Sequence, residues 1–332
     1  MPDPRVFTPD QGEVKFYRAV HPIAMTRILI TGANGFLGSN LCHVLSRNKV
    51  YEIFGTSRSG SAGLPDGSQF FRGDLLDKTF VSDLVSRIGP DIVINTVSLV
   101  NVDLCEENPG LAEKVIVKTA GNLAEALSSS DGRLIQISSD QLFNGRGMLY
   151  SETDTPDPVN VYGKMKLRAE EIVAQQKPES LIIRTNFFGW SPEGHPPTFA
   201  EWIYSSLTEQ KPITLFTDLY FSPIEVSLLV ESIEILMGKD LSGILNVVGP
   251  DRCSKYDFGI ALAKEFKLDS SIIHASAVRP DSFRAKRQMD LSLSIRKFER
   301  ITGKKTPDLD SSLSRFYQNR NLKSVLGRCP ER

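Results

Sequence analysis

A tyrosine and a lysine four positions apart, Tyr162 and Lys166, form the pair in this sequence that is best suited to acid–base chemistry. On a helix, residues at this spacing lie on one face, so the phenol and the ammonium would be neighbours. A phenol whose pKa is about 10 exchanges protons poorly at neutral pH, and a nearby ammonium stabilises its phenolate and lowers that pKa. The spacing therefore predicts a proton donor or acceptor for a substrate oxygen.

A serine-rich segment offers the group that would hold this oxygen. The apolar run 133–137 predicts a buried strand, and the sequence S-S-D-Q follows it directly at 138–141. In open α/β sheets, ligands bind beyond the carboxyl ends of the strands. We therefore expect Ser139 to hold the substrate oxygen beside Tyr162. Taken alone, the tyrosine and lysine spacing also occurs in ordinary amphipathic helices, where the tyrosine is packed and the lysine is solvated.

A loop with three glycines is the second chemically informative feature. The segment 27–41 reads R-I-L-I-T-G-A-N-G-F-L-G-S-N-L, which predicts a buried strand, a tight turn and a helix. Gly32 would permit the turn, Gly35 the approach of a pyrophosphate, and Gly38 the close packing of helix on strand. The helix N-terminus would then face the anion. We interpret the loop as a dinucleotide site, the alternative being an ordinary strand-to-helix turn.

The end of the next expected strand bears on the choice of cofactor. An NAD site usually places an acidic residue about 20 positions beyond the glycines to bind the ribose 2′-hydroxyl, whereas a 2′-phosphate favours arginine and hydroxyl donors. Here the segment 56–59 reads T-S-R-S, and Arg58 lies 58 − 38 = 20 positions after Gly38. This pattern favours NADP(H). The alternative is that Arg58 is a solvated turn residue.

Together these motifs resemble the extended branch of the short-chain dehydrogenase/reductase superfamily, most closely the dTDP-4-dehydrorhamnose reductase group. The glycine loop, the serine strand end and Y-x-x-x-K occur in the order of that superfamily, over most of residues 26–250. The resemblance implies that NADPH reduces the C4 ketone of a nucleotide-linked 4-keto-6-deoxy sugar. In this scheme Ser139 bonds the carbonyl oxygen, Tyr162 protonates it, and Lys166 tunes Tyr162 and holds the nicotinamide ribose.

The resemblance also implies which residues line the two binding sites. Asp74 would either bond the adenine amine or cap the helix expected near Lys78, and both interpretations stay open. The implied cofactor contacts are Gly32, Asn34, Gly35, Phe36, Leu37, Gly38, Ser57, Arg58, Asp74, Leu75, Thr96, Val97, Tyr162, Lys166, Thr185 and Asn186. The implied substrate contacts are Ser98, Asp140, Gln141, Phe187, Trp202 and Arg279. For Trp202 a core position, and for Arg279 a solvated basic loop, are the alternatives.

Some positions differ from the usual pattern of the superfamily. Ile116 stands where extended reductases commonly have an asparagine, in the middle of a helix expected over 111–128, and Thr96 and Val97 replace small alanines. Gln141 cannot exchange a proton as the glutamate of related sugar dehydratases does, which disfavours dehydration. Two other functions stay open: a nucleotide-sugar epimerase, and a non-catalytic NADP-binding subunit resembling the regulatory subunit of methionine adenosyltransferase.

The composition excludes several other classes of protein. The chain has 39 basic and 40 acidic residues, a net charge of −1 and no basic cluster suited to nucleic acid. It contains no apolar run long enough for a membrane span and no signal-peptide core, so we expect a cytoplasmic protein. Its four cysteines and four histidines are scattered, which predicts reduced thiols and no metal site. A homodimer is one assembly that stays open.

The order of the expected elements predicts an α/β fold with a Rossmann-like, doubly wound parallel sheet and a smaller C-terminal substrate-binding lobe. We expect an N-terminal extension at 1–24 and an NADP-binding domain at 25–190, whose sheet is completed by a strand within about 215–250. Residues 191–332, richer in proline and aromatic residues at their start, would mainly form the substrate-binding lobe.

Overall fold

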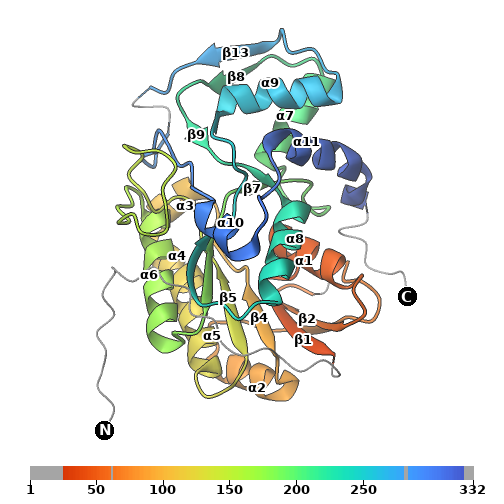
Figure 1. The fold of residues 1–332 in the computed structure, drawn as a ribbon, viewed down its shortest axis with the longest axis vertical. Helices are drawn as coiled ribbons and strands as arrows, with labels where there is room; N and C mark the ends of the chain where they lie inside the picture. Colours follow the sequence, from red (N-terminus) through yellow and green to blue (C-terminus); the bar gives the residue numbers. More distant parts are fainter. Residues whose placement is uncertain (1–24, 61–62, 280–282, 325–332) are drawn as a thin grey trace.

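The computed structural model describes residues 25–60, 63–279 and 283–324, and the expected N-terminal extension lies outside them. Seven parallel strands form the central sheet, in the order β11-β6-β5-β4-β1-β2-β3 (Figure 1). The strands are β1 Thr26–Thr31, β2 Tyr51–Ser57, β3 Gln69–Arg72, β4 Ile92–Asn95, β5 Arg133–Ile137, β6 Leu181–Arg184 and β11 Gly243–Asn246. This arrangement confirms the predicted Rossmann-like fold. The order in which successive strands are added to the sheet reverses between β1 and β4, and such sheets bind ligands at this point.

Helices cover both faces of the sheet, which explains why its central strands are continuous apolar runs. One face packs against α1 Phe36–Leu45, α8 Val226–Met237 and α10 Arg296–Thr302. The other face packs against α2 Lys78–Ile88, α3 Val102–Glu107, α4 Pro109–Ala112, α5 Thr119–Leu127 and α6 Val161–Gln176. The sheet therefore lies in the middle of a three-layer α/β lobe.

The helix expected over 111–128 is not continuous. Between α4 and α5, the segment η1 Glu113–Lys118 is a π-helix, in which each turn holds an extra residue. Ile116 lies in this wide turn and is buried, while the Thr119 hydroxyl donates to the Val115 carbonyl at 2.6 Å. An apolar side chain thus fills the position where extended reductases commonly have an asparagine.

A second, smaller lobe lies above the sheet in Figure 1 and has its own aromatic core. Phe188, Trp190, Phe258 and Phe316 meet there in stacked and edge-to-face pairs. Its elements are α7 Phe199–Thr208, β8 Ile213–Phe216, β9 Tyr220–Phe221, β12 Cys253–Ser254, α9 Lys255–Phe266, β13 Ile273–Ser276 and α11 Leu309–Gln318. The short strands β7 Phe187–Phe188 and β10 Ile224–Glu225 pair between the lobes, and η2 Asn319–Ser324 follows α11.

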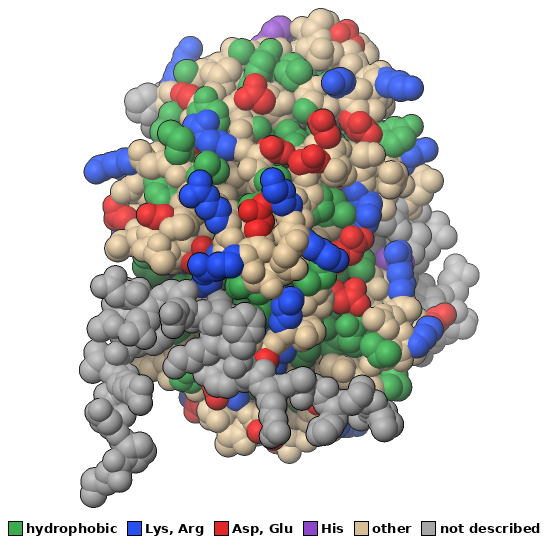
Figure 2. All heavy atoms as spheres, viewed as in Figure 1, with side chains coloured by type: hydrophobic (Ala, Val, Ile, Leu, Met, Phe, Trp, Pro, Cys, Tyr) green, Lys and Arg blue, Asp and Glu red, His purple; other side chains and the backbone are tan. Residues whose placement is uncertain are grey.

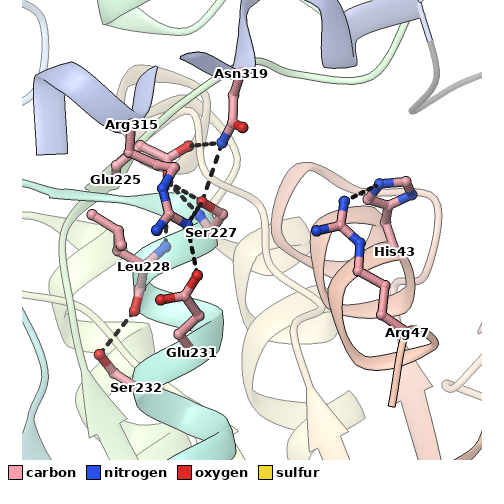
Figure 3. Close-up of polar contacts among 9 residues, drawn as sticks. All are labelled: His43, Arg47, Glu225, Ser227, Leu228, Glu231, Ser232, Arg315 and Asn319. Atoms are coloured by element: carbon pink, nitrogen blue, oxygen red, sulfur yellow. Dashed lines mark hydrogen bonds and ion pairs between the residues drawn. The ribbon is translucent and has the colours of Figure 1, made fainter. Parts of the chain in front are cut away.

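Helix α11 and the residue that follows it are fastened to the sheet lobe by polar contacts at the start of α8 (Figure 3). Buried Glu225 caps α8 by accepting the Ser227 amide at 2.7 Å, and Asn319 donates to the Glu225 carboxylate at 3.3 Å. Arg315 of α11 donates to Glu231 at 2.6 Å. These contacts hold the second lobe and the sheet lobe together on the side opposite α6.

The surface carries no large field of one sign on the face drawn in Figure 2, where Lys and Arg side chains alternate with Asp and Glu. No helix among residues 25–60, 63–279 and 283–324 combines the length and the apolar character that crossing a bilayer requires. Within the same ranges, Cys42, Cys105 and Cys253 are buried free thiols, and no cluster of ligand side chains could hold a metal. Cys329 lies outside the described residues.

A buried ion pair joins β6 to α6, the helix that carries Tyr162. The Arg184 guanidinium donates to the Glu170 carboxylate at 2.7 and 3.0 Å, and the exposed fractions of these side chains are 2% and 4%. The guanidinium also lies 5.5 Å from the centroid of the Phe143 ring. Removing one partner would leave the other charge buried and unpaired, so this pair makes the packing of α6 on the sheet sensitive to substitution.

Replacing Glu170 with alanine should lower the free energy of unfolding by about 3 to 5 kcal/mol, because the Arg184 charge then stays buried without its partner. Urea denaturation followed by circular dichroism measures the change. Glu113→Ala is the matched control, since it breaks the exposed pair with Arg168 and should cost less than about 1 kcal/mol. Equal losses in the two variants would contradict this account.

Candidate active site

The glycine loop has the geometry that its sequence predicts. Gly32 has a φ of 67°, in the left-handed region that favours glycine. A Cβ atom on Gly38 would lie 2.1 Å from the Gly32 carbonyl oxygen, so α1 approaches β1 more closely than any side chain permits. The first turn of α1 consequently stands directly over the end of β1, at the reversal point of the sheet. A backbone cradle of this kind, opening at a helix N-terminus, suits a phosphate.

The end of β2 lies beside this loop. Asn34 donates to the Ser59 hydroxyl at 3.1 Å and also to the Gly60 carbonyl. The Ser57 hydroxyl donates to the Ser59 carbonyl at 2.7 Å. Arg58 is exposed here, and its own carbonyl accepts from Arg72 at 3.1 Å. The segment with the hydroxyls and the arginine that the sequence pointed to therefore lies at one edge of the loop.

The loop that follows β4 packs against the glycine loop. The Thr96 hydroxyl donates to the Thr31 carbonyl at 2.6 Å, and a Cβ on Gly32 would meet Thr96 at 2.8 Å and Val97 at 3.2 Å. The two residues that replace small alanines thus pack directly against the first glycine. Strand β4 itself ends at Asn95, so Thr96 and Val97 belong to the loop that follows it.

Asp74 does not cap α2. Of the two roles considered for Asp74, helix cap and adenine contact, the cap is therefore wrong. Asp77 is the cap and accepts the amides of Thr79 and Phe80 at 2.9 and 3.2 Å. The Asp74 side chain instead accepts the Leu76 amide at 3.0 Å, within its own turn. The neighbouring Leu75 side chain is buried in the core, and only its carbonyl has a polar contact, with Asn122 at 2.8 Å.

The Lys166 ammonium is buried between α6 and the end of β5. Lys166 is only 3% exposed, and its Nζ donates to the Ile137 carbonyl at 3.1 Å. Nζ also lies 5.9 Å from the centroid of the Tyr162 ring. The one-face geometry predicted from the spacing is therefore present in α6, whose N-cap is Asn160.

The pKa of Tyr162 moves in the opposite direction from the one expected. Burial is the largest cause and raises the phenol pKa to about 12, while the nearby hydroxyls of Ser139 and Ser98 lower it only in part. The Lys166 ammonium does not offset this burial, and its own pKa falls to about 8 because it is buried as well. In this structure Tyr162 is a neutral phenol at neutral pH and can donate a proton.

Ser139 is held in place by its neighbours. Its hydroxyl donates to Asp140 at 3.1 Å and accepts the Gln141 amide at 3.2 Å. Asp140 is 2% exposed, and Asn186 donates to its other carboxylate oxygen. Burial raises the pKa of Asp140 to about 6, although Asn186, Lys255 and Ser139 each lower it. Polar groups therefore lead from Tyr162 through Ser139 and Asp140 to Asn186, which lines the space between the lobes.

A cavity of about 320 Å³ lies at this junction. Gln141, Asn186 and Trp202, three of the expected substrate or cofactor contacts, line it, and the aromatic rings of the second lobe form much of its wall. Phe187 packs instead against Phe36 at 5.4 Å between ring centroids, and exposed Arg279 lies outside the lining. A larger open hollow of about 790 Å³ lies between α9 and α11 and contains none of the predicted site residues.

The basic cluster around Arg279 is partly neutralised by α3. Arg287 pairs with Asp103 at 2.9 Å, and Arg284 pairs with Glu107. Lys255, which no local pattern in the sequence singles out, lines the cavity from the first turn of α9. Thr185 is buried at the end of β6, close to Asn186 in the chain.

Comparison with known proteins places this arrangement in a family. Residues 25–322 match the family model described as the RmlD substrate binding domain. The chain belongs to that family. As an RmlD-type chain it is 27% identical to the dTDP-4-dehydrorhamnose reductase of Aggregatibacter actinomycetemcomitans over 301 residues, which cover 87% of this chain and 97% of the relative.

Two further relatives mark the range of this RmlD family. The methionine adenosyltransferase 2 subunit beta of Rattus norvegicus is 27% identical over 307 residues, covering 86% of this chain and 85% of the relative. The solved structure of dTDP-4-dehydrorhamnose reductase from Bacillus anthracis in complex with NADP superposes with a TM-score of 0.78 at 25% identity, over 89% of this chain and 99% of the other. Solved epimerases at 18 to 22% identity share the fold.

Replacing Asp140 with asparagine should remove a pH-dependent loss of stability that the native chain shows between about pH 4 and 6. The pKa of Asp140 rises from 3.8 to about 6 on folding, so its ionised form costs the folded state about 3 kcal/mol above pH 6 and nothing below pH 3.8. The stability of Asp140→Asn relative to the native chain should therefore increase as the pH rises from about 4 to about 6. Urea titrations at several pH values measure it, and a difference independent of pH would contradict this assignment.

Proposed function

We propose that this protein uses NADPH to reduce the C4 ketone of a nucleotide-linked 4-keto-6-deoxy sugar. The observation that carries the proposal is the convergence of Ser139, Tyr162 and Lys166 at the carboxyl end of β5, beside the cavity between the lobes. The sugar nucleotide reductases in the family support the substrate class.

The chain's own residues fit a phosphorylated dinucleotide. The Gly32 turn and the close approach at Gly38 leave backbone amides facing outward at the start of α1, where a pyrophosphate would be held. Ser57, Arg58 and Ser59 would bind a 2′-phosphate through hydroxyl and guanidinium donors, which supports NADP(H) over NAD(H). Lys166 would bond the nicotinamide ribose. The NADP-bound reductase of similar fold supports the same choice.

The side chains divide the chemistry between them. When bound, NADPH would supply the hydride for the ketone carbon. The Ser139 hydroxyl, positioned by the Gln141 amide, would turn from Asp140 to donate to the ketone oxygen. Tyr162, whose raised pKa keeps its proton in place at neutral pH, would donate that proton to the oxygen as negative charge develops on it. Lys166 would stabilise the resulting phenolate.

A second function is favoured by one specific observation. The methionine adenosyltransferase 2 subunit beta covers nearly the whole chain at an identity equal to that of the reductase relative. An NADP-binding regulatory subunit without turnover is therefore the alternative. The presence of all three of Ser139, Tyr162 and Lys166 supports catalysis.

Replacing Tyr162 with phenylalanine should reduce the turnover number about 10²- to 10⁴-fold, because the general acid is lost. NADPH oxidation is followed by absorbance at about 340 nm with dTDP-, UDP- and GDP-linked 4-keto-6-deoxy sugars. NADPH binding by the variant is measured as the control. Full activity in Tyr162→Phe would refute the mechanism. NADPH binding by the native chain without oxidation of any sugar would favour the regulatory alternative.

Replacing Arg58 with alanine should weaken NADPH binding about tenfold or more and leave NADH binding nearly unchanged, since only the 2′-phosphate contact is removed. Fluorescence titration with each nucleotide measures both affinities. Lys211→Ala, which removes an exposed cation of the second lobe, serves as the matched control. A parallel loss for NADPH and NADH would show that Arg58 acts through the loop and not through the phosphate.

A further inference from the structure

Lys255 is a cation set into the aromatic wall of the cavity. It is the first residue of α9, where the Ser254 cap fixes the helix start and the Lys255 amide donates to the Leu219 carbonyl at 2.9 Å. Its ammonium lies 3.3 Å from the centroid of the Phe221 ring and 4.7 Å from that of the Phe199 ring. Two ring faces therefore hold the charge where it lines the cavity.

The carboxylate that balances this charge comes from the other lobe. Asp140 raises the pKa of the Lys255 ammonium, although burial is the larger cause and lowers that pKa to about 8. Asp140 and Lys255 form no ion pair, because the Asp140 carboxylate accepts from Ser139 and Asn186 instead. Asn186 itself lines the cavity. Among the described residues, the ammonium is thus left with ring faces and no hydrogen-bond acceptor.

Arg287, another cation in the described lining of the cavity, is engaged through one nitrogen, while its Nη1 has no hydrogen-bond partner. Arg287 pairs with Asp103 and lies 5.0 Å from the centroid of the Phe283 ring. Lys255 differs from Arg287 in that its ammonium contacts only ring faces among the described residues, so a bound molecule would meet all of its donors directly. Its three N–H donors require acceptors, and the flanking rings offer flat apolar faces of the kind that pack against the C–H face of a sugar.

We propose that Lys255 is a specificity-determining residue that binds the sugar part of the substrate by donating to one of its oxygen atoms, with the sugar ring against Phe199 and Phe221. This inference rests on the proposed reductase function. The Lys255 ammonium would select sugars with an oxygen acceptor at that position, a hydroxyl above all. It would reject sugars with an amino group there, because two cations would then lie at hydrogen-bond distance.

The test compares three lysine variants in the full chain with NADPH and a dTDP-linked 4-keto-6-deoxyhexose. Lys255→Met keeps the length and removes the charge, and it should raise the KM for the sugar nucleotide about 10- to 100-fold, the value of one charge-assisted hydrogen bond. The KM for NADPH should change less than about twofold. Lys255→Arg should recover much of the loss, and Lys264→Met, an exposed lysine on the same helix, should match the native chain.

Selectivity provides a second readout. The 2-amino and 3-amino analogues of the same sugar nucleotide should be poorer substrates than the hydroxyl form for the native chain. The analogue that is rejected most strongly should gain about tenfold in relative kcat/KM in Lys255→Met, because the repulsion is removed. Unchanged selectivity would overturn the assignment of the contact.

The outcomes separate the two proposals. Turnover by the native chain with an unchanged sugar KM in Lys255→Met overturns this inference and leaves the reductase function standing. If the native chain oxidises no NADPH, calorimetric binding of unreactive dTDP-glucose decides the matter. Tighter binding by the native chain than by Lys255→Met then supports the lysine contact without the reaction, and equal or absent binding overturns it. A loss of thermal stability equal in Lys255→Met and Lys255→Arg, with both KM values raised, would assign Lys255 a structural role.

Discussion

The placement of one ammonium group, that of Lys166, sets the geometry of the whole site. Burying a cation is costly, and the structure compensates by giving Nζ the carbonyl of Ile137 at the last residue of β5. Because that bond ties α6 to the end of a central strand, the phenol of Tyr162 is brought to the serine segment that leaves the same strand. The Arg184 and Glu170 pair fixes the next strand to the same helix. The position of the Tyr162 phenol and the packing of α6 thus depend on the same buried charges.

The site is completed by residues from the two lobes, and this explains what each lobe contributes. The sheet lobe presents backbone amides, hydroxyls and a proton donor at the ends of β1, β4 and β5. The smaller lobe contributes rings and one lysine, held by short strands and by α7 and α9. Contacts of α11 with α8 keep the lobes in register. Chemistry common to a fold family can therefore be retained in one lobe while the other changes its selectivity.

The sequence predicted the sheet, the glycine loop and the face shared by Tyr162 and Lys166, because each depends on local periodicity or on short spacings. It could not predict the direction of the Tyr162 pKa, which depends on how deeply α6 is buried, or the π-helical turn around Ile116. Asp77 took the capping role considered for Asp74 because it stands one residue before α2. Lys255 was missed since its rings and Asp140 come from distant parts of the chain.

A row of hydrogen-bonded polar side chains runs across three strands of the sheet lobe, inside an otherwise apolar layer. Thr31 pairs with Asn95 in register and donates to it at 2.7 Å, and Asn95 in turn donates to Gln136 of β5 at 2.7 Å. If any of these strands shifted by one residue, two or three buried amides and hydroxyls would lose their hydrogen-bond partners. The surrounding isoleucines and valines would tolerate the same shift. The row thus favours the native register of β1, β4 and β5, and this register sets where the loops after these strands begin.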